Sequence, residues 1–344
     1  MIHTMKVIFP LSHDEVYELN ARGINPLKIN DYLHSSYPST TFSIYQAANS
    51  RWFLSMVIDV VELLGLSEFY DLMYGTVESH IRGMLMSIFN HARHYEYHRL
   101  KRIDYKHDVV VESEVERSLL LHLYRKMTKS FKYQKLKSGT QQEDSFKVYS
   151  TTVYHSSGSV LTKLYDKTAE RNDKGLPIKT YEQDVLRYEV SLTDKHIDYR
   201  ANAHVCTEPV EASIKDYFKE DMKYRYFTDY LLPIYLKGDF YKIEKAEELI
   251  NVSTFNPNMK SKLKHFLVQV SRGNLDTPLK KQEIKNMKTF NARIERLYSL
   301  NINPLSIPKN YKDAPMYLRN PLQDLYDDVQ SIRDCHKKGQ KLPF

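Results

Sequence analysis

Three segments of the chain carry charged or phenolic side chains at two-residue steps, the spacing that places them on one face of a β-strand. The residues concerned are Arg102 and Asp104, then Lys163, Tyr165 and Lys167, and finally Arg187 and Glu189. If the three strands are neighbours in a sheet, two carboxylates, a tyrosine and several cations face one surface. Carboxylate oxygens are ligands that Mg²⁺ and Mn²⁺ prefer, and a cation held against a phosphate polarises it for attack. The pattern therefore indicates a phosphoryl-transfer site.

Tyr165 is the nucleophile candidate in this set. A phenolate can attack phosphorus and split one transfer into two easier steps. The ordinary pKa of tyrosine is about 10, and a nearby metal ion, Lys163 or Lys167 would favour the charged form. A structural interpretation stands beside this one, because charged residues on an open sheet face are commonly solvated or paired across strands.

Alternating apolar and polar residues predict the strands that would position these groups. We expect strands over residues 4–11, 41–46, 52–61, 100–111, 146–154, 159–165 and 184–192. The sequence His-Ser-Ser-Gly at residues 155–158 predicts a hairpin turn between two of them. Because the strands come in hairpin-like runs rather than in strict alternation with helices, an antiparallel sheet is expected.

Helices are predicted between the strands and through the C-terminal third. Ser12 with Glu15, and Ser113 with Glu116, have the spacing of capping boxes that open helices, the second reaching to about residue 131. Apolar residues at a 3.6-residue period predict a long helix over 68–90. From about residue 210 the pattern is helical, with a break near Gly238. We therefore predict an α+β fold, with an antiparallel-sheet domain over residues 1–237 and a small helical module over 238–344.

Composition narrows the class of protein. The chain has 344 residues, a formal net charge of +7 and only two cysteines, Cys206 and Cys335. A mild basic excess fits a nucleic-acid partner. The longest apolar stretch is short and interrupted by charges, so we expect no membrane span, and the N-terminus lacks the pattern of a signal peptide. Two cysteines outside any Cys-x-x-Cys spacing predict neither a disulfide framework nor a structural zinc site, and favour a cytoplasmic location.

Several blocks of sequence, in order, resemble the replication initiators of the gene II/gene X type, known from filamentous phages, with relatives on plasmids and integrated elements of Gram-positive bacteria. The blocks are Arg102-Ile103-Asp104, Ser150 to Tyr154, Leu164-Tyr165-Asp166-Lys167 with Glu170, Leu186-Arg187-Tyr188-Glu189-Val190, and Met287 to Pro304. The opening residues 1–11 are also similar to the family's first strand. The resemblance is densest over residues 100–200.

The resemblance implies a metal-dependent, site- and strand-specific DNA endonuclease and strand transferase that starts rolling-circle replication at a double-stranded origin. It would hold the 5′ end on a tyrosine, and it implies a fold of the rolling-circle initiator type. The family's tyrosine and lysine fall on Tyr165 and Lys167. Its aspartate and glutamate fall on Asp104 and Glu189, which would bind Mg²⁺ or Mn²⁺. Arg102, Arg187 and Lys163 would contact phosphates, or the arginines would hold the carboxylates.

Two points stay open beside these assignments. Related enzymes often carry a His-hydrophobic-His metal motif, which this chain lacks, and His155 is our candidate for a third metal ligand. The cluster of His91, His94 and His98 favours a solvated helix end over the alternative of a metal site. A neighbouring class of plasmid initiators places its nucleophile on a later helix, which would correspond here to Tyr217, Tyr224, Tyr226 or Tyr230. That aromatic and basic run, with Tyr224 and Arg225, would stack bases and bind phosphates, or pack on the sheet as an ordinary helix.

The expected partner is origin DNA, single-stranded or cruciform at the nick site, with a host helicase and a second copy of the chain as further candidates. Basic residues on the C-terminal helices, among them Lys288 and Arg293, would contact phosphates, or form a solvated cap or an oligomer surface. Two other functions remain open. One is a non-catalytic origin- or operator-binding protein, and the other is a mobilisation relaxase with the same chemistry at a transfer origin.

Overall fold

The computed structural model describes residues 1–127, 130–131, 134–137, 139–141, 146–148 and 151–337. The chain divides into two compact units, each assembled from three segments. The first unit contains Met1–His107, Gly158–Leu161 and Glu189–Tyr226, and the second contains Asp108–Ser157, Thr162–Tyr188 and Phe227–Phe344. Three strands, β4 (Arg99–Val110), β10 (Val160–Asp166) and β11 (Val185–Leu192), contribute residues to both units.

The first unit is built on strands in the order β2-β3-β1-β4-β11. The three new strands are β1 (Ile2–Leu11), β2 (Thr40–Gln46) and β3 (Trp52–Asp59). β1 pairs antiparallel with β3 on one side and β4 on the other, so Thr4 lies opposite both Asp59 and Asp104. This register brings the start of the chain beside the strand that carries the Arg-x-Asp block.

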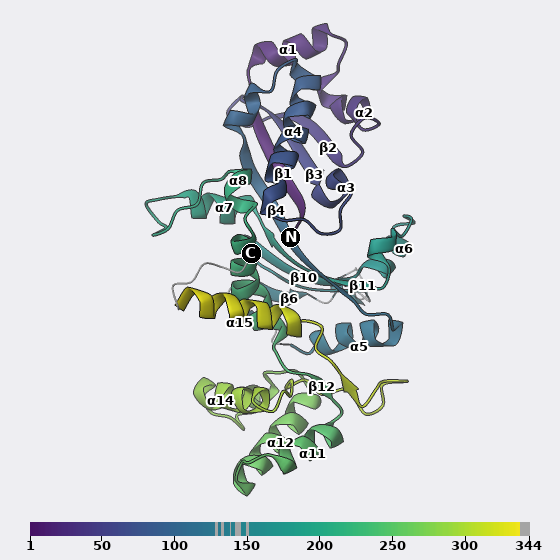
Figure 1. Ribbon diagram of the computed structural model, residues 1–344, viewed down its shortest axis with the longest axis vertical. Helices are drawn as coiled ribbons and strands as arrows, with labels where there is room; N and C mark the ends of the chain where they lie inside the picture. The colour runs from purple at the N-terminus through teal and green to yellow at the C-terminus, as the bar shows by residue number, and fades with distance from the viewer. Residues whose placement is uncertain (128–129, 132–133, 138, 142–145, 149–150, 338–344) are drawn as a thin grey trace. The chain divides into compact units, whose positions relative to one another are not determined.

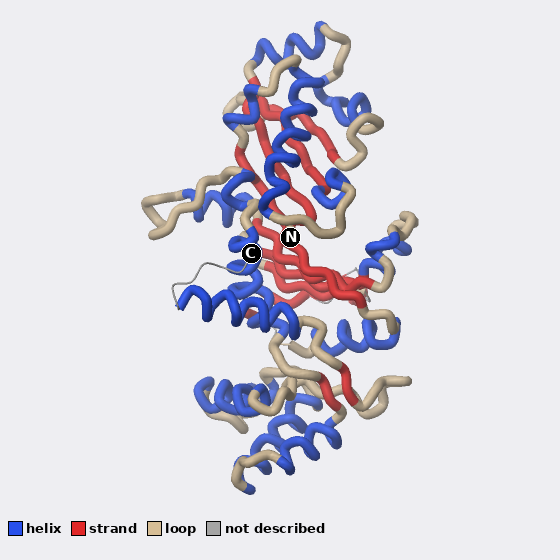
Figure 2. Tube along the Cα trace, viewed as in Figure 1, coloured by secondary structure: helices blue, strands red, loops and turns tan. Residues whose placement is uncertain are grey.

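A long helix, α4 (Tyr74–Phe89), lies across the strands of this unit (Figures 1 and 2). Its buried residues recur at helical spacing, which gives one continuous apolar face. They are Val77, Ile81, Met84, Leu85, Ile88 and Phe89. The helix ends at Asn90, whose φ of 61° is the left-handed conformation that terminates many helices. The chain then turns sharply into a 3₁₀ segment, η3 (Arg93–Tyr97), that leads into β4.

Shorter helices complete the first unit. They are α1 (His13–Ala21), η1 (Pro26–Lys28), α2 (Ile29–Leu33), α3 (Val60–Leu64), η2 (Asp71–Met73), α7 (Asp194–Ala201), α8 (Ile214–Tyr217) and α9 (Glu220–Tyr226). The capping box predicted at α1 is present: the Ser12 hydroxyl accepts from the Glu15 amide, and the Glu15 carboxylate accepts from the Ser12 amide. Local sequence therefore sets where this helix begins.

The second unit has strands in the order β11-β10-β9-β6-β5. The new strands are β5 (Ser130–Phe131), β6 (Gln134–Lys137) and β9 (Thr152–Ser156), with a separate pair, β7 (Gly139–Gln141) and β8 (Phe146–Val148). The helices near them are α5 (Glu114–Tyr124), α6 (Lys167–Asp173) and η4 (Thr180–Glu182). Asp166 caps α6 by accepting from the Ala169 amide, so the strand carrying Tyr165 passes directly into that helix.

The remainder of the second unit is mostly helical (Figure 1). Its elements are η5 (Phe227–Leu231, a π-helix), α10 (Leu232–Tyr235), β12 (Phe240–Tyr241), α11 (Ile243–Val252), α12 (Pro257–Ser271), α13 (Thr277–Lys280), α14 (Met287–Tyr298), β13 (Tyr317–Leu318) and α15 (Gln323–Lys337). Gly238, with a φ of 88°, lies against the backbone of Ile302 and Asn303 at a distance that a side chain could not share. A separate domain over 238–344 stays a prediction.

The α+β class and the antiparallel pairing are confirmed, and several element boundaries are corrected. Residues 60 and 61 begin α3 instead of extending β3, because the Asp59 side chain caps that helix. The long helix begins at Tyr74 after the short turn η2. The helix after Ser113 ends at Tyr124, and residues 146–154 divide into β8 and β9, with residues 149–150 outside the described part of the chain. The turn lies after His155, which is a strand residue of β9.

Candidate functional site

Two buried carboxylates lie on the first unit's sheet, on neighbouring strands. The side chains of Asp104 on β4 and Glu189 on β11 are each 2% exposed. β11 lies between β4 and β10, so the three strands that carry the polar residues are neighbours in the sheet. Burying a carboxylate costs several kcal/mol unless it is paired or hydrogen-bonded. Each of these two groups must therefore have a strong partner.

The partner of Asp104 is Arg102, two residues earlier on the same face of β4. The guanidinium donates from Nε to Oδ1 over 2.9 Å and from Nη2 to Oδ2 over 2.6 Å, a bidentate fork. Although burial alone would lower the pKa of Arg102, the Asp104 contacts raise it above its ordinary value. The Arg102 side chain is 44% exposed, so one end of this buried pair reaches solvent.

The partner of Glu189 is His3 from β1, which sequence reasoning missed. Its Nδ1 lies 2.7 Å from Glu189 Oε1, and its Nε2 lies 3.9 Å from Asp59 Oδ2. The two residues are 186 positions apart in sequence, and the strand order β1-β4-β11 brings them together. A histidine immediately before the predicted first strand was the available signal, but its partner depended on the strand order.

This group offers two carboxylates and an imidazole, a donor set suited to a divalent ion. Two donors about 2.1 Å from an octahedral ion are about 3.0 Å apart, so His3 and Glu189 would separate by a few tenths of an ångström to share one. The Asp104 carboxylate is held by the Arg102 fork. In the described part of the chain, Asp104, Glu189 and His3 are not a set of three whose ligand atoms all lie within 4.8 Å of one another. Their donor types suit Mg²⁺ or Mn²⁺, but a shared ion would require the three side chains to move together.

Tyr165 and Lys167 belong to the second unit. Tyr165 is buried at the end of β10, and Lys167 Nζ lies 5.8 Å from its ring centroid. Lys167, itself 4% exposed, donates to Glu170 over 2.7 Å and lies 3.6 Å from Glu182. An ammonium at this distance over an aromatic face is within cation–π range. The lysine thus sits between a phenol ring and two carboxylates.

Ion pairs fix the junction between β10 and α6 that carries Tyr165. Arg171 donates twice to Glu182, each over 2.7 Å, and Arg117 reaches Asp166 and Asp184, each over 2.8 Å. Burial alone would raise the pKa of Glu182, but Arg171 and Lys167 lower it overall. This network holds the first turn of α6 in a single arrangement.

Three other predicted site residues also fall in the second unit. Arg187 is 1% exposed, and its guanidinium pairs with both oxygens of Asp108, over 2.7 and 2.9 Å. His155 is fully buried on β9, opposite Leu136 of β6. Lys163 on β10 is half-buried. The structure thus divides the predicted set, with Asp104, Glu189 and Arg102 in the first unit and Tyr165, Lys167, His155, Arg187 and Lys163 in the second.

The later tyrosines in the first unit are largely core residues. Tyr217 and Tyr226 are at most 2% exposed, and burial raises the pKa of Tyr217 to about 12 and raises that of Tyr226 further. Tyr226 shares a hydrogen bond of 3.0 Å with His196. Tyr224 is also buried, with Lys223 over its ring at 4.7 Å, whereas the adjacent Arg225 is exposed. Burial of these rings leaves little face for a base to stack on.

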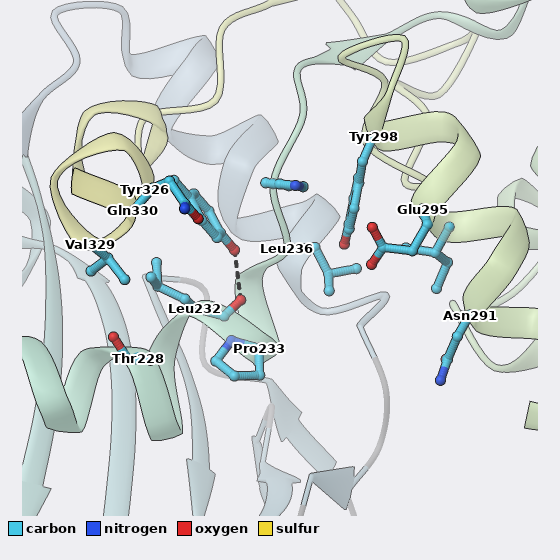
Figure 3. A pocket seen from close by; sticks show the side chains of 12 residues that line it. Thr228, Leu232, Pro233, Leu236, Asn291, Glu295, Tyr298, Tyr326, Val329 and Gln330 are labelled. Carbon is cyan, nitrogen blue, oxygen red and sulfur yellow. Dashed lines mark hydrogen bonds between the residues drawn. The ribbon is translucent and has the colours of Figure 1, made fainter. Parts of the chain in front are cut away.

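The C-terminal helices contain a cavity of about 400 Å³, shown in Figure 3. It is lined from η5, α10, α14 and α15, and the Tyr326 hydroxyl donates to the Leu232 carbonyl over 2.6 Å at its edge. Neither predicted basic residue of α14 lines it. Lys288 is exposed, and Arg293 is half-buried with its guanidinium 6.0 Å from the Phe266 ring centroid.

One group of metal-ligating side chains does converge in the first unit, away from Asp104 and Glu189. Among the residues that the structure describes, Glu15, His91 and His94 are the one set of three such side chains whose ligand atoms all lie within 4.8 Å of one another. The interpretation of the histidine cluster as a solvated helix end is wrong for His94, which is 5% exposed. It is also wrong for His98, whose ring nitrogens contact the Tyr95 carbonyl and the Ile214 amide.

No protein-family model matches this chain, and no curated protein matches it in sequence. Within the described part of the chain, no helix combines the length and apolar character needed to cross a bilayer.

Proposed function

We propose that this protein initiates rolling-circle replication by nicking one strand of a double-stranded origin and holding the 5′ end on a tyrosine. The observation that carries the proposal is the buried pair of carboxylates, Asp104 and Glu189, on neighbouring strands with His3 against one and Arg102 against the other. Folding stability alone gives little reason to bury two carboxylates, since apolar residues serve there as well or better. Such groups are enriched at functional sites.

In this proposal, the two carboxylates and His3 would move together to hold Mg²⁺ or Mn²⁺, and the ion would polarise the scissile phosphate as a Lewis acid. Arg102, released from Asp104, would donate its fork to a phosphate oxygen, because the same geometry suits both anions. The partial exposure of the Arg102 side chain supports this movement of its guanidinium from Asp104 to a phosphate. The net charge of +7 favours the approach of a polyanion.

The transfer itself balances without any co-reactant. The tyrosine oxygen forms a bond to phosphorus as its proton leaves to solvent, and the bond from phosphorus to the 3′ oxygen breaks. The electron pair of that bond stays on the 3′ oxygen, which takes up a proton and becomes the primer end for synthesis. The phosphodiester energy is retained in the phosphotyrosyl link, so the reverse step can rejoin the strand. Tyr165 is the proposed nucleophile, with Lys167 favouring its phenolate.

One observation favours a second candidate, a DNA-binding protein without nuclease activity. Asp104 and Glu189 each already have a close protein partner, as carboxylates with only a structural role would. In that case the two pairs would simply fix the order of β1, β4 and β11. The two functions differ in whether DNA is cut.

The test is cleavage of labelled single-stranded oligonucleotides tiled across the protein's own replicon, with Mn²⁺ or Mg²⁺. Products are resolved on denaturing gels, and the adduct is mapped by peptide mass spectrometry. We expect a covalent 5′-phosphotyrosyl adduct on Tyr165 that EDTA prevents. Tyr165→Phe should abolish it, whereas Tyr199→Phe, at a tyrosine that is 53% exposed, should not. Asp104→Asn and Glu189→Gln should abolish cleavage, with Asp198→Asn as the matched control.

An adduct on a tyrosine of the 217–230 run would keep the nicking function and overturn the choice of nucleophile. DNA binding without cleavage or adduct on any tile would overturn the nicking function and leave the non-catalytic alternative. Cleavage only at a transfer origin would assign the same chemistry to mobilisation instead of replication.

A further inference from the structure

Glu15, His91 and His94 come from two segments that the first unit brings together. Glu15 lies in the first turn of α1, whereas both histidines follow the end of α4. The Nε2 atoms of both rings face the same carboxylate oxygen, Glu15 Oε1, at 3.8 Å from His91 and 3.0 Å from His94. Three donor atoms of metal-ligating type therefore converge on one point.

His94 provides the strongest evidence that a ligand binds between Glu15, His91 and His94. Its side chain is 6% exposed, and its buried Nε2 has no hydrogen bond of normal geometry although Glu15 Oε1 is only 3.0 Å away. A buried polar atom without a hydrogen bond costs about 1–3 kcal/mol, and native proteins keep few of them. An ion that accepts the lone pair of this nitrogen would remove that cost.

The separations match those of a tetrahedral ion. Zinc binds imidazole nitrogen and carboxylate oxygen at about 2.0–2.2 Å, and two such ligands at the tetrahedral angle are about 3.3–3.5 Å apart. The measured 3.0 and 3.8 Å lie on either side of that range. Shifts of a few tenths of an ångström would make both correct.

The surroundings of the two imidazoles also suit a metal site. Phe89 packs against both rings, at 6.2 Å from His91 and 4.7 Å from His94 between centroids, and supplies an apolar wall.

We propose that Glu15, His91 and His94 form a structural site for a borderline transition ion of the Zn²⁺ class, with water as the fourth ligand. Two imidazoles and one carboxylate select such an ion over Mg²⁺, which prefers oxygen ligands and keeps most of its water. The ion would hold the start of α1 against the segment that follows α4 and leads into β4. It is separate from the proposed nuclease metal and does not depend on it.

Arg93 would compete with this ion for the Glu15 carboxylate. Its Nη2 donates to the same Glu15 oxygen over 2.9 Å, but the side chain is 66% exposed and can turn into solvent. Removing its charge should therefore strengthen ion binding. A cluster that serves only as an ion pair with Arg93 would show no such gain.

The experiment is equilibrium dialysis of the full chain against Zn²⁺, after EDTA treatment, with metal content measured by mass spectrometry. A Co²⁺ titration followed by visible absorption reports the geometry. We expect one tightly held Zn²⁺ and intense tetrahedral Co²⁺ bands. His91→Gln, at a half-buried position that should tolerate the change, and His94→Gln should each weaken binding by at least about 10- to 100-fold. Arg93→Gln should tighten it, and His204→Gln, at an exposed histidine, should leave it unchanged.

Asp104→Asn and Glu189→Gln should retain the Zn²⁺, which separates this site from the proposed nuclease metal. Binding that survives His91→Gln and His94→Gln together, or that disappears with Asp104→Asn, would overturn the assignment. Weak binding of Zn²⁺ to the unaltered chain, with no tetrahedral Co²⁺ signal, would also overturn it.

Discussion

The pairing of Arg102 with Asp104 allows a quantitative test of the proposed metal site. Arg102→Gln removes the fork and leaves the Asp104 carboxylate, 2% exposed, without its counter-charge. Removing one member of a fully buried ion pair costs about 3–5 kcal/mol, and hydrogen bonds to a charged group contribute about 1.5–3 kcal/mol. Because the Arg102 side chain is 44% exposed, water can enter the space it leaves. We therefore expect the free energy of unfolding to fall by about 2 kcal/mol.

A bound divalent ion should reverse this loss, because it takes the place of the guanidinium. An ion at 100 times its dissociation constant stabilises a protein by about 2.7 kcal/mol. In the wild type, binding must first displace Arg102, whereas in Arg102→Gln it need not. The variant should therefore bind Mn²⁺ up to about 30-fold more tightly, since 1.4 kcal/mol corresponds to a factor of ten.

The assay is urea unfolding with EDTA and with Mn²⁺, together with Mn²⁺ titration, in a His91→Gln background that removes the other candidate site. Asp104→Asn is the matched control and should lose both the Mn²⁺ affinity and the stabilisation. Equal Mn²⁺ affinity in the wild type, Arg102→Gln and Asp104→Asn would refute the reasoning that an ion and Arg102 compete for this carboxylate.

Three further outcomes are expected. Glu182→Gln should lower the free energy of unfolding in urea by about 3 kcal/mol near neutral pH, whereas the exposed Lys174→Gln should cost under about 1 kcal/mol. Arg171 and Lys167 hold the pKa of folded Glu182 below its ordinary value of 4.5. The stabilisation by Glu182 is therefore complete above pH 4.5 and is lost as the pH falls through the lower pKa of the folded state. The difference in stability between wild type and Glu182→Gln should shrink in acid. Gly238→Ala should destabilise the chain by more than about 1–3 kcal/mol, since a Cβ there would meet the Ile302 carbonyl carbon at 2.7 Å. Gly83→Ala in α4, where a Cβ would meet open space, should stabilise the chain by about 0.5–1 kcal/mol in the same urea measurement. Tyr217→Phe should leave DNA cleavage unchanged, because burial raises the pKa of Tyr217 to about 12 and disfavours its phenolate, and loss of the adduct in this variant would contradict that argument.

The local elements followed from the sequence, because short-range chemistry decides them. Ser12 with Glu15 and Ser113 with Glu116 marked two helix starts correctly, since the side chains that satisfy the first free amides lie within one turn. Alternation located β1, β4 and β11 to within two residues at each end. Where a cap competed with a strand pattern, as Asp59 does at α3, the local cap decided the boundary.

The composition of the candidate site was only partly readable from the sequence. The two-residue spacing correctly placed Arg102 and Asp104 on one face, and the neighbouring strand supplied Glu189. The same spacing placed Arg187 and Glu189 on a polar face of β11, yet every residue of that strand is buried. Alternation reports which residues share a face, but what covers that face comes from distant parts of the chain.

Partners across strands were decided by the tertiary structure alone. His3 lies against Glu189, 186 residues away, and Arg187 pairs with Asp108, 79 residues away. The burial of Tyr217, and of His94 beside Glu15, likewise depended on which elements pack together. The sequence by itself determined the helix starts, the strands and the chemical types available, because these depend on neighbours within a few residues. Strand order and register decided which of those groups meet, because contacts between distant segments depend on the packing of the whole chain.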